Sequence, residues 1–115
     1  MTFPTNVHNS YHAHVYFDES SSDFAAQLRS QITQEFTLAV GRFHQKLVGP
    51  HNMWSFSVSF EKADFDQLIP WLDNARGRLS VLVHAVTGDD IIDHTDYAYW
   101  LGSPVKLNLS ALDTH

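Results

Sequence analysis

The sequence predicts an α+β domain in which an antiparallel sheet carries two helices on one of its faces. Two observations lead to this prediction. Segments typical of strands occur at four places in the chain, and apolar residues at helical spacing occur at two. They follow one another as strand, helix, strand, strand, helix, strand. The length of 115 residues suits a single domain, which we expect to span residues 1–115 with its core at about 10–103.

The first strand is predicted over Tyr11–Phe17, where apolar residues occupy every second position. Because side chains alternate across a strand, His12, His14 and Tyr16 share the opposite face. Serine and aspartate residues that can cap a helix come next. Apolar residues then recur at positions 24, 28, 32, 36 and 40, which predicts an amphipathic helix over about Asp23–Val40.

Gly41 is expected to end this helix, and Arg42–Val48 is expected to form the second strand. The strict alternation of Trp54–Phe60 is the clearest strand pattern in the chain. A second helix is predicted over about Lys62–Asn74. Pro70 lies inside it, at a point where a proline can kink or split a helix.

The fourth strand is predicted over Leu79–Ala85. A polar loop with a short helical or irregular segment follows it, up to Gly102. This order of elements is the split βαβ arrangement of ferredoxin-like folds. We therefore expect the first and third strands in the centre of the sheet, the fourth strand beside the first, and both helices on one face.

Composition and charge exclude several classes of protein. No cysteine is present, which excludes disulfides, thiolate metal sites, Fe–S clusters and a cysteine nucleophile. The net charge of -6 argues against nucleic acid as a partner. The sequence has neither the pattern of a signal peptide nor an apolar run of about 18 residues. We therefore expect a cytoplasmic protein with no membrane partner.

The sheet face opposite the helices is predicted to be polar and rich in histidine. His12 and His14 lie on one strand with their Cα atoms about 6.6 Å apart, since a strand rises about 3.3 Å per residue. His84 lies on the neighbouring strand and points to the same face. Three neutral imidazoles that converge in this way can hold a metal ion with open coordination positions. An exposed strand face without a metal is the alternative.

His51, in the turn before the third strand, and His94, after the fourth, are expected at the rim of this face. We predict that they act as acid or base, because the imidazole pKa lies near neutrality; completing the metal shell and binding substrate are alternatives. Tyr16, Ser55 and Ser57 are predicted to form hydrogen bonds with a substrate. The remaining histidines are predicted to be incidental: His8, His44 and His115.

The sequence resembles the DOPA 4,5-dioxygenase family, small proteins of fungi and bacteria, over about residues 10–103. The matching segments are Tyr11-His12-Ala13-His14-Val15-Tyr16-Phe17, Gly49-Pro50-His51, Leu82-Val83-His84, Thr87-Gly88-Asp89, Asp93-His94 and Trp100-Leu101-Gly102. The histidines that match those of the family are His12, His14, His51, His84 and His94.

The resemblance implies a ferredoxin-like fold and an oxidoreductase that opens the ring of a catechol such as DOPA by extradiol cleavage with O2. It does not by itself say which histidines bind the metal. We expect Fe(II) as the cofactor, held by His12, His14 and His84 because strand geometry brings these three together. Zinc or another divalent metal is an alternative occupant of the same nitrogen ligands.

Two other functions fit the same histidines. A metal-free isomerase or hydrolase would use them as acid and base. A non-catalytic domain would bind a small aromatic molecule or a metal without consuming O2. Metal analysis and oxygen uptake distinguish these functions from the dioxygenase.

We also expect a homodimer, because a half-exposed sheet face that carries Leu82 and Met53 is commonly covered by a second subunit. The alternative is that the segment Ile91–Leu109 of the same chain covers this face.

Overall fold

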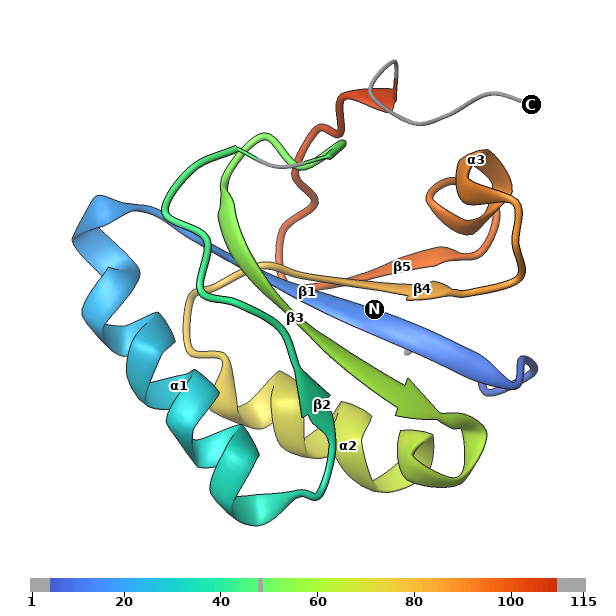
Figure 1. Cartoon of the computed structure of the whole chain (residues 1–115), viewed down its shortest axis with the longest axis horizontal. Coiled ribbons are helices and arrows are strands. Elements are labelled where there is room, and N and C mark those ends of the chain that lie inside the picture. The colour runs from blue at the N-terminus through green and yellow to red at the C-terminus, as the bar shows by residue number, and fades with distance from the viewer. Residues whose placement is uncertain (1–4, 48, 110–115) are drawn as a thin grey trace.

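The computed structural model describes residues 5–47 and 49–109, and within them an antiparallel sheet of five strands in the order β2-β3-β1-β4-β5. The strands are β1 (Ser10–Phe17), β2 (Ala39–Val40), β3 (Trp54–Glu61), β4 (Val81–Ala85) and β5 (Ala98–Leu101). The helical segments are the 3₁₀ turn η1 (Glu19–Ser21), α1 (Ser22–Glu35), α2 (Lys62–Ala75) and the short α3 (Asp90–Asp93). Figure 1 shows α1 and α2 on one side of the sheet and α3 on the other.

The predicted α+β, ferredoxin-like arrangement is confirmed. β1 and β3 lie side by side within the sheet, and β4 pairs with the other edge of β1, as expected from the element order. The fifth strand, β5, was not predicted. It is four residues long and follows a polar loop, so its own sequence carries too short an alternating pattern to identify a strand. It forms because β4 offers a free edge to which it pairs.

The sheet face toward α1 and α2 is the apolar core. Alternate residues of β1, β3 and β4 point into it and have no exposed surface: Ala13, Val15, Phe17, Phe56, Val58, Val81 and Val83. The helices contribute Leu28 and Ile32 from α1 and Phe65, Leu68, Ile69 and Leu72 from α2. This distribution follows the two-residue period of the strands and the helical period of α1 and α2.

The first helix is shorter than predicted. α1 ends at Glu35, and Phe36 already has the extended backbone angles φ -130° and ψ 150°. Phe36, Leu38 and Val40 all pack, half-buried, against the core, so the apolar residues here follow the period of an extended chain. A spacing of four residues between Phe36 and Val40 fits both periods. The helical pattern was therefore wrongly extended to Val40.

The second strand does not lie where it was predicted. Among its described residues, Arg42–Val48 contributes one isolated bridge to β3, at His44, and Val48 lies outside the described residues. Gly41 explains the break. Its carbonyl oxygen accepts two hydrogen bonds from the guanidinium of Arg29, at 3.0 and 2.8 Å, and is therefore turned toward α1.

α2 confirms the second predicted helix and runs without interruption through Pro70. Gly77 follows its end with a positive φ of 58°, a conformation that favours glycine at a helix terminus. The ring of Phe24 on α1 lies so close to Gly77 that a Cβ atom at this position would be 2.8 Å from the ring. The close approach helps to fix α1 against the end of α2.

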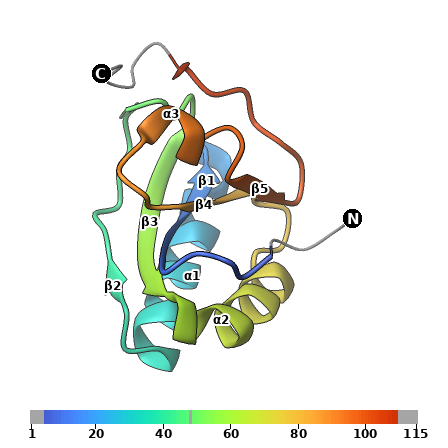
Figure 2. The same cartoon turned by 90° about the vertical axis from the view of Figure 1, so that its right-hand side faces the viewer.

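The opposite sheet face is covered by segments of the same chain. Figure 2 shows α3 and the segment after β5 on this side. The backbone N–H of Asn108 donates to the carbonyl of Pro50 at 2.7 Å, and the Asn52 amide donates to the carbonyl of Lys106 at 2.8 Å. On this face Leu82 is 0% exposed. The segment Ile91–Leu109 therefore lies over the face that suggested a homodimer, as in the alternative given above. The homodimer stays a prediction.

None of the helices in the described part of the chain has both the length and the apolar character needed to cross a membrane.

A matched pair of substitutions tests the core. Leu28 is 1% exposed on α1, whereas Leu47 is 62% exposed in the loop before β3. We expect Leu28→Ala to lower the free energy of unfolding by about 2–5 kcal/mol, because it leaves a cavity in the core. Leu47→Ala should change it by less than about 0.5 kcal/mol. Urea denaturation of both variants measures the difference, and equal effects would contradict the assigned core.

Candidate active site

The pairing of β1 with β4 brings three histidines together. His12 lies directly opposite His84 in the antiparallel register, and His14 follows two residues later on the same face of β1. On the other side of β1, the residues opposite His12 and His14 are the small serines Ser59 and Ser57. The sheet therefore gathers imidazoles on β1 and β4 and flanks them with short side chains on β3.

The rings of His14 and His84 stack at an interplanar angle of 14°, and their Nε2 atoms are 2.8 Å apart. The other ring nitrogen of His84, Nδ1, lies 2.7 Å from the carbonyl oxygen of Ala85. A carbonyl can only accept, so Nδ1 of His84 carries the proton, and the lone pair on its Nε2 accepts a hydrogen bond from Nε2–H of His14. The backbone thus prepares His84 to bind a cation through Nε2.

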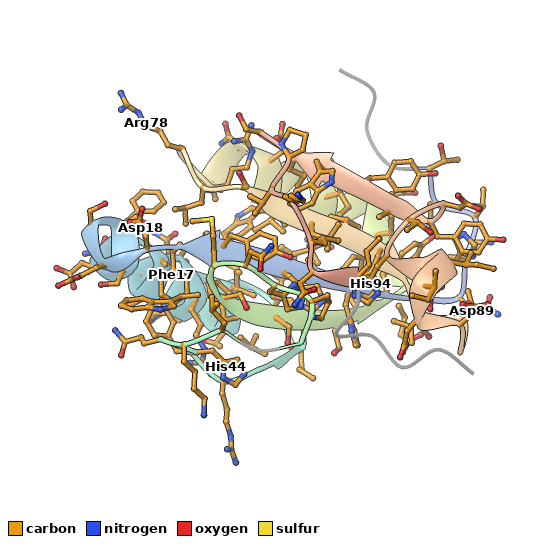
Figure 3. The ribbon with its side chains drawn as sticks, turned by 90° about the horizontal axis from the view of Figure 1, so that it is seen from above. Phe17, Asp18, His44, Arg78, Asp89 and His94 are labelled. Atoms are coloured by element: carbon orange, nitrogen blue, oxygen red, sulfur yellow. The ribbon has the colours of Figure 1, made fainter. Side chains whose placement is uncertain are left out.

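Two loops bring further histidines over this face. The ring centroid of His51 lies 4.2 Å from that of His14, and the centroid of His94 lies 4.1 Å from that of His84. His94 follows α3, and its Nδ1 lies 2.8 Å from the carbonyl oxygen of Asp90, which leaves Nε2 of His94 with a free lone pair. In Figure 3, His94 lies over the sheet and His44 lies near the edge of the molecule.

Five histidines therefore line one cavity of about 240 Å³, together with Pro50, Val86, Asp90 and Asp93. Within the described residues, two groups could hold a metal ion, and in each group the ligand atoms lie within 4.8 Å of one another. One group is His12, His14 and His84. The other is His14, His51 and His94. The two groups share His14, so the positions alone allow either to be the metal site.

Burial favours the neutral form of four of these imidazoles, those of His12, His14, His51 and His84. Loss of hydration, with repulsion from neighbouring imidazoles as a smaller cause, lowers the pKa of His84 to about 3 and the pKa of His51 to about 4. The same causes hold the pKa of His14 well below the usual value. The pKa of His12 is also lowered, partly offset by the carboxylate of Asp93. Neutral imidazole is the form that binds metals, so the set fits a metal ion at physiological pH.

The predicted substrate-binding residues lie outside the lining of the cavity. The hydroxyl of Tyr16 is 2.5 Å from Nδ1 of His51, and its ring stacks on Trp100 at a centroid distance of 5.7 Å. Tyr16 is 1% exposed, and burial raises the pKa of its phenol. Ser55 and Ser57 lie on the same face of β3 but do not line the cavity. Tyr16 therefore contacts the cavity through His51.

Sequence reasoning missed the role of Asp93. This carboxylate is 2% exposed and accepts two hydrogen bonds from Thr87, from the backbone N–H at 2.8 Å and from Oγ1 at 2.7 Å. The contact closes the loop that carries His94. A local signal for the loop is Asp89, a typical cap residue, whose side chain accepts from the N–H of Ile92 at the start of α3.

The donor set fits a divalent transition metal. Imidazole nitrogen suits iron, zinc, copper and nickel, whereas magnesium and calcium prefer oxygen ligands. The backbone contact of His84 is the kind of outer hydrogen bond that orients a metal-bound histidine.

Comparison with known proteins identifies the family. The family model described as "Dopa 4,5-dioxygenase family" matches residues 11–111. The chain belongs to this family, and the matched range contains all five histidines of the cavity.

Among curated relatives, an uncharacterized 21.2 kDa protein of Botryotinia fuckeliana is 34% identical over 92% of this chain and 64% of its own length. The DOPA 4,5-dioxygenase of Amanita muscaria is 28% identical over 89% of this chain and 49% of its own length. The chain thus spans between about half and two thirds of these relatives. A crystal structure from Nostoc punctiforme, of a protein provisionally described as a dioxygenase, is 41% identical with a TM-score of 0.87 over 90% of each chain.

The lowered histidine pKa values predict acid instability of the metal-free protein. Unfolded histidine takes up a proton near pH 6.5, whereas folded His51 and His84 resist protonation down to about 4 and 3. The unfolded state therefore binds more protons between these limits, so stability is complete above about pH 7 and falls as the pH drops. We expect a loss on the order of 4–6 kcal/mol between pH 7 and pH 4, because each of the two groups contributes about 2–3 kcal/mol.

Urea denaturation at several pH values, with a chelator present, measures this loss. His51→Gln removes one of the titrating groups and should make the pH dependence shallower. His8→Gln serves as the control, since His8 lies outside the cavity lining. A metal-free protein whose stability is constant from pH 7 to pH 4 would contradict the buried, neutral state of the cluster.

Proposed function

We propose that this protein is an extradiol ring-cleaving dioxygenase that acts on a catechol such as DOPA, with a divalent metal held by histidine and O2 as co-substrate. The observation that carries the proposal is the convergence of five histidines on one cavity, in a chain of the Dopa 4,5-dioxygenase family. The names of the Amanita muscaria relative and of the Nostoc punctiforme structure support the same reaction class.

The proposed reaction balances without a further reductant. The ring C–C bond between one hydroxyl-bearing carbon and its neighbour without a hydroxyl breaks, and the O–O bond breaks. Two new C–O bonds form, so both oxygen atoms enter the product, which is a ring-opened acid with an aldehyde. The catechol supplies the electrons that reduce O2.

We assign His12, His14 and His84 as the metal ligands and Fe(II) as the native metal. These residues lie on paired strands, and sites on regular elements hold their geometry better than sites on loops. A bound Fe(II) would supply a Lewis acid for the catechol oxygens and a redox-active centre for O2. Zinc would fit the same nitrogen atoms without redox chemistry, so zinc in the purified protein would leave the native metal open.

His94 and His51 would transfer protons to and from the substrate. Nε2 of His94 has a free lone pair, because Nδ1 of this ring is bound to the carbonyl of Asp90. His94 is therefore suited to accept a proton from a catechol hydroxyl. His51 lies across the cavity, with its ring centroid 6.2 Å from that of His94, so the two imidazoles could act on different oxygen atoms.

The cavity has the size of a single aromatic ring with a short substituent. A cavity of about 150 Å³ accommodates benzene, and this one measures about 240 Å³. A larger groove of about 440 Å³ lies between α1 and α2, on the other side of the sheet. Its lining includes Phe24, Trp71 and Glu35 but no histidine, so it offers no comparable chemistry.

Substitution of single histidines tests the metal site. We expect His84→Ala to weaken zinc or Fe(II) binding at least about a hundredfold and to abolish ring cleavage, because it removes a ligand. His8→Ala should leave both unchanged, since His8 contacts Tyr11 and Tyr97 away from the cavity. Titration calorimetry with the metal-free protein gives the affinities. Full metal binding by His12→Ala, His14→Ala and His84→Ala would overturn the ligand assignment.

Anaerobic loading with Fe(II), followed by oxygen-electrode assays on a panel of catechols, tests the reaction. We expect one O2 to be consumed per catechol, with a new absorbance from the ring-opened product. Metal-independent turnover would favour the isomerase or hydrolase. Binding of a catechol without oxygen uptake would favour a non-catalytic binding domain.

A further inference from the structure

The contact between Tyr16 and His51 is buried, and the tyrosine is supported from behind. Tyr16 is 1% exposed and His51 is 7% exposed. The phenol oxygen lies 2.5 Å from Nδ1 of the imidazole. Behind it, the tyrosine ring stacks on Trp100 of β5, so the hydroxyl is held in place by the sheet.

The proton in this contact belongs to the phenol. Within the described residues, the Tyr16 hydroxyl makes a single hydrogen bond, to Nδ1 of His51. If Nδ1 were the donor, the hydroxyl proton would remain buried without an acceptor, which proteins avoid. Tyr16 therefore donates and Nδ1 accepts. A neutral imidazole with an accepting Nδ1 carries its own proton on Nε2.

The histidines of the cavity thus differ in tautomer. Nδ1 of His84 and Nδ1 of His94 donate to backbone carbonyls, which leaves a lone pair on Nε2 of each. His51 has the opposite arrangement, because its partner is a hydroxyl. An Nε2–H group has no lone pair for a metal, but it can donate a hydrogen bond to an oxygen atom.

We propose that Tyr16 is a positioning residue, which holds His51 in the Nε2–H tautomer and thereby makes it a hydrogen-bond donor in the cavity rather than a metal ligand. This removes the group of His14, His51 and His94 as the metal site. That the donor acts on a substrate oxygen, where negative charge develops, rests on the proposed function.

Nitrogen NMR of the histidine side chains tests the tautomer directly. In the metal-free protein at pH 7, we expect His51 to show a protonated Nε2 and an unprotonated Nδ1, and His84 to show the reverse. Tyr16→Phe should shift His51 toward a mixture of tautomers and leave His84 unchanged. Tyr97→Phe is the control, because it removes a phenol hydroxyl at a site outside the cavity lining. The His51 signals are identified by their loss in His51→Gln.

Metal binding gives a second readout that needs no turnover. His51→Gln and Tyr16→Phe should bind zinc within about threefold of the wild type. In the Fe(II)-loaded enzyme, Tyr16→Phe should lower kcat for a catechol at least tenfold with little change in KM, since the donor is lost in the reaction rather than in binding.

Two results would overturn the proposal. One is a wild-type His51 with its proton on Nδ1. The other is a loss of zinc affinity of a hundredfold or more in His51→Gln, which would make His51 a ligand. Neither result requires Tyr16→Phe to fold. If the NMR and zinc results are as expected and no catechol is consumed, the positioning of His51 stands and the proposed dioxygenase function fails.

Discussion

The antiparallel register between β1 and β4 is the constraint on which the rest of the site depends. It places His12 opposite His84 and leaves His14 on the same face of the sheet. A slip of one residue would reverse every side chain of the strand, turning the histidines into the core and Ala13 and Val15 out of it. The packing of α1 and α2 excludes that alternative, because the apolar face of β1 is completely buried beneath them. The same strand register therefore determines both the hydrophobic core on one face of the sheet and the histidine cluster on the other.

The parts of the fold that follow a regular period over many residues could be predicted from the sequence. Alternation over residues 54–60 identified β3 to within one residue, because one face of the strand is buried throughout. The predictions of strands failed where contacts between distant parts of the chain determine the structure. The carbonyl of Gly41 accepts from Arg29 of α1, although the N–H of Gly41 still pairs with β3, and β5 forms only against the edge of β4. Neither contact is local in sequence, so no local pattern could indicate it.

The candidate site divides in the same way. Strand alternation alone predicted that His12, His14 and His84 share a face, and the structure brings them together. That His51 and His94 reach the same cavity depends on how two loops fold back over the sheet. The bond from Tyr16 to His51 and the contact between Asp93 and Thr87 were beyond prediction, because each depends on side-chain positions fixed by the complete fold.

The loop that carries His94 has a consequence for how this architecture can diversify. Its hydrogen bonds are internal, from Thr87 to Asp93 and from His94 to Asp90, whereas the strand histidines are held by the sheet. Changes in the loop can therefore alter the shape and polarity of the cavity mouth while the strand histidines keep their spacing. One platform of strands could therefore serve chains that bind different molecules, provided that they differ only in this short surface segment.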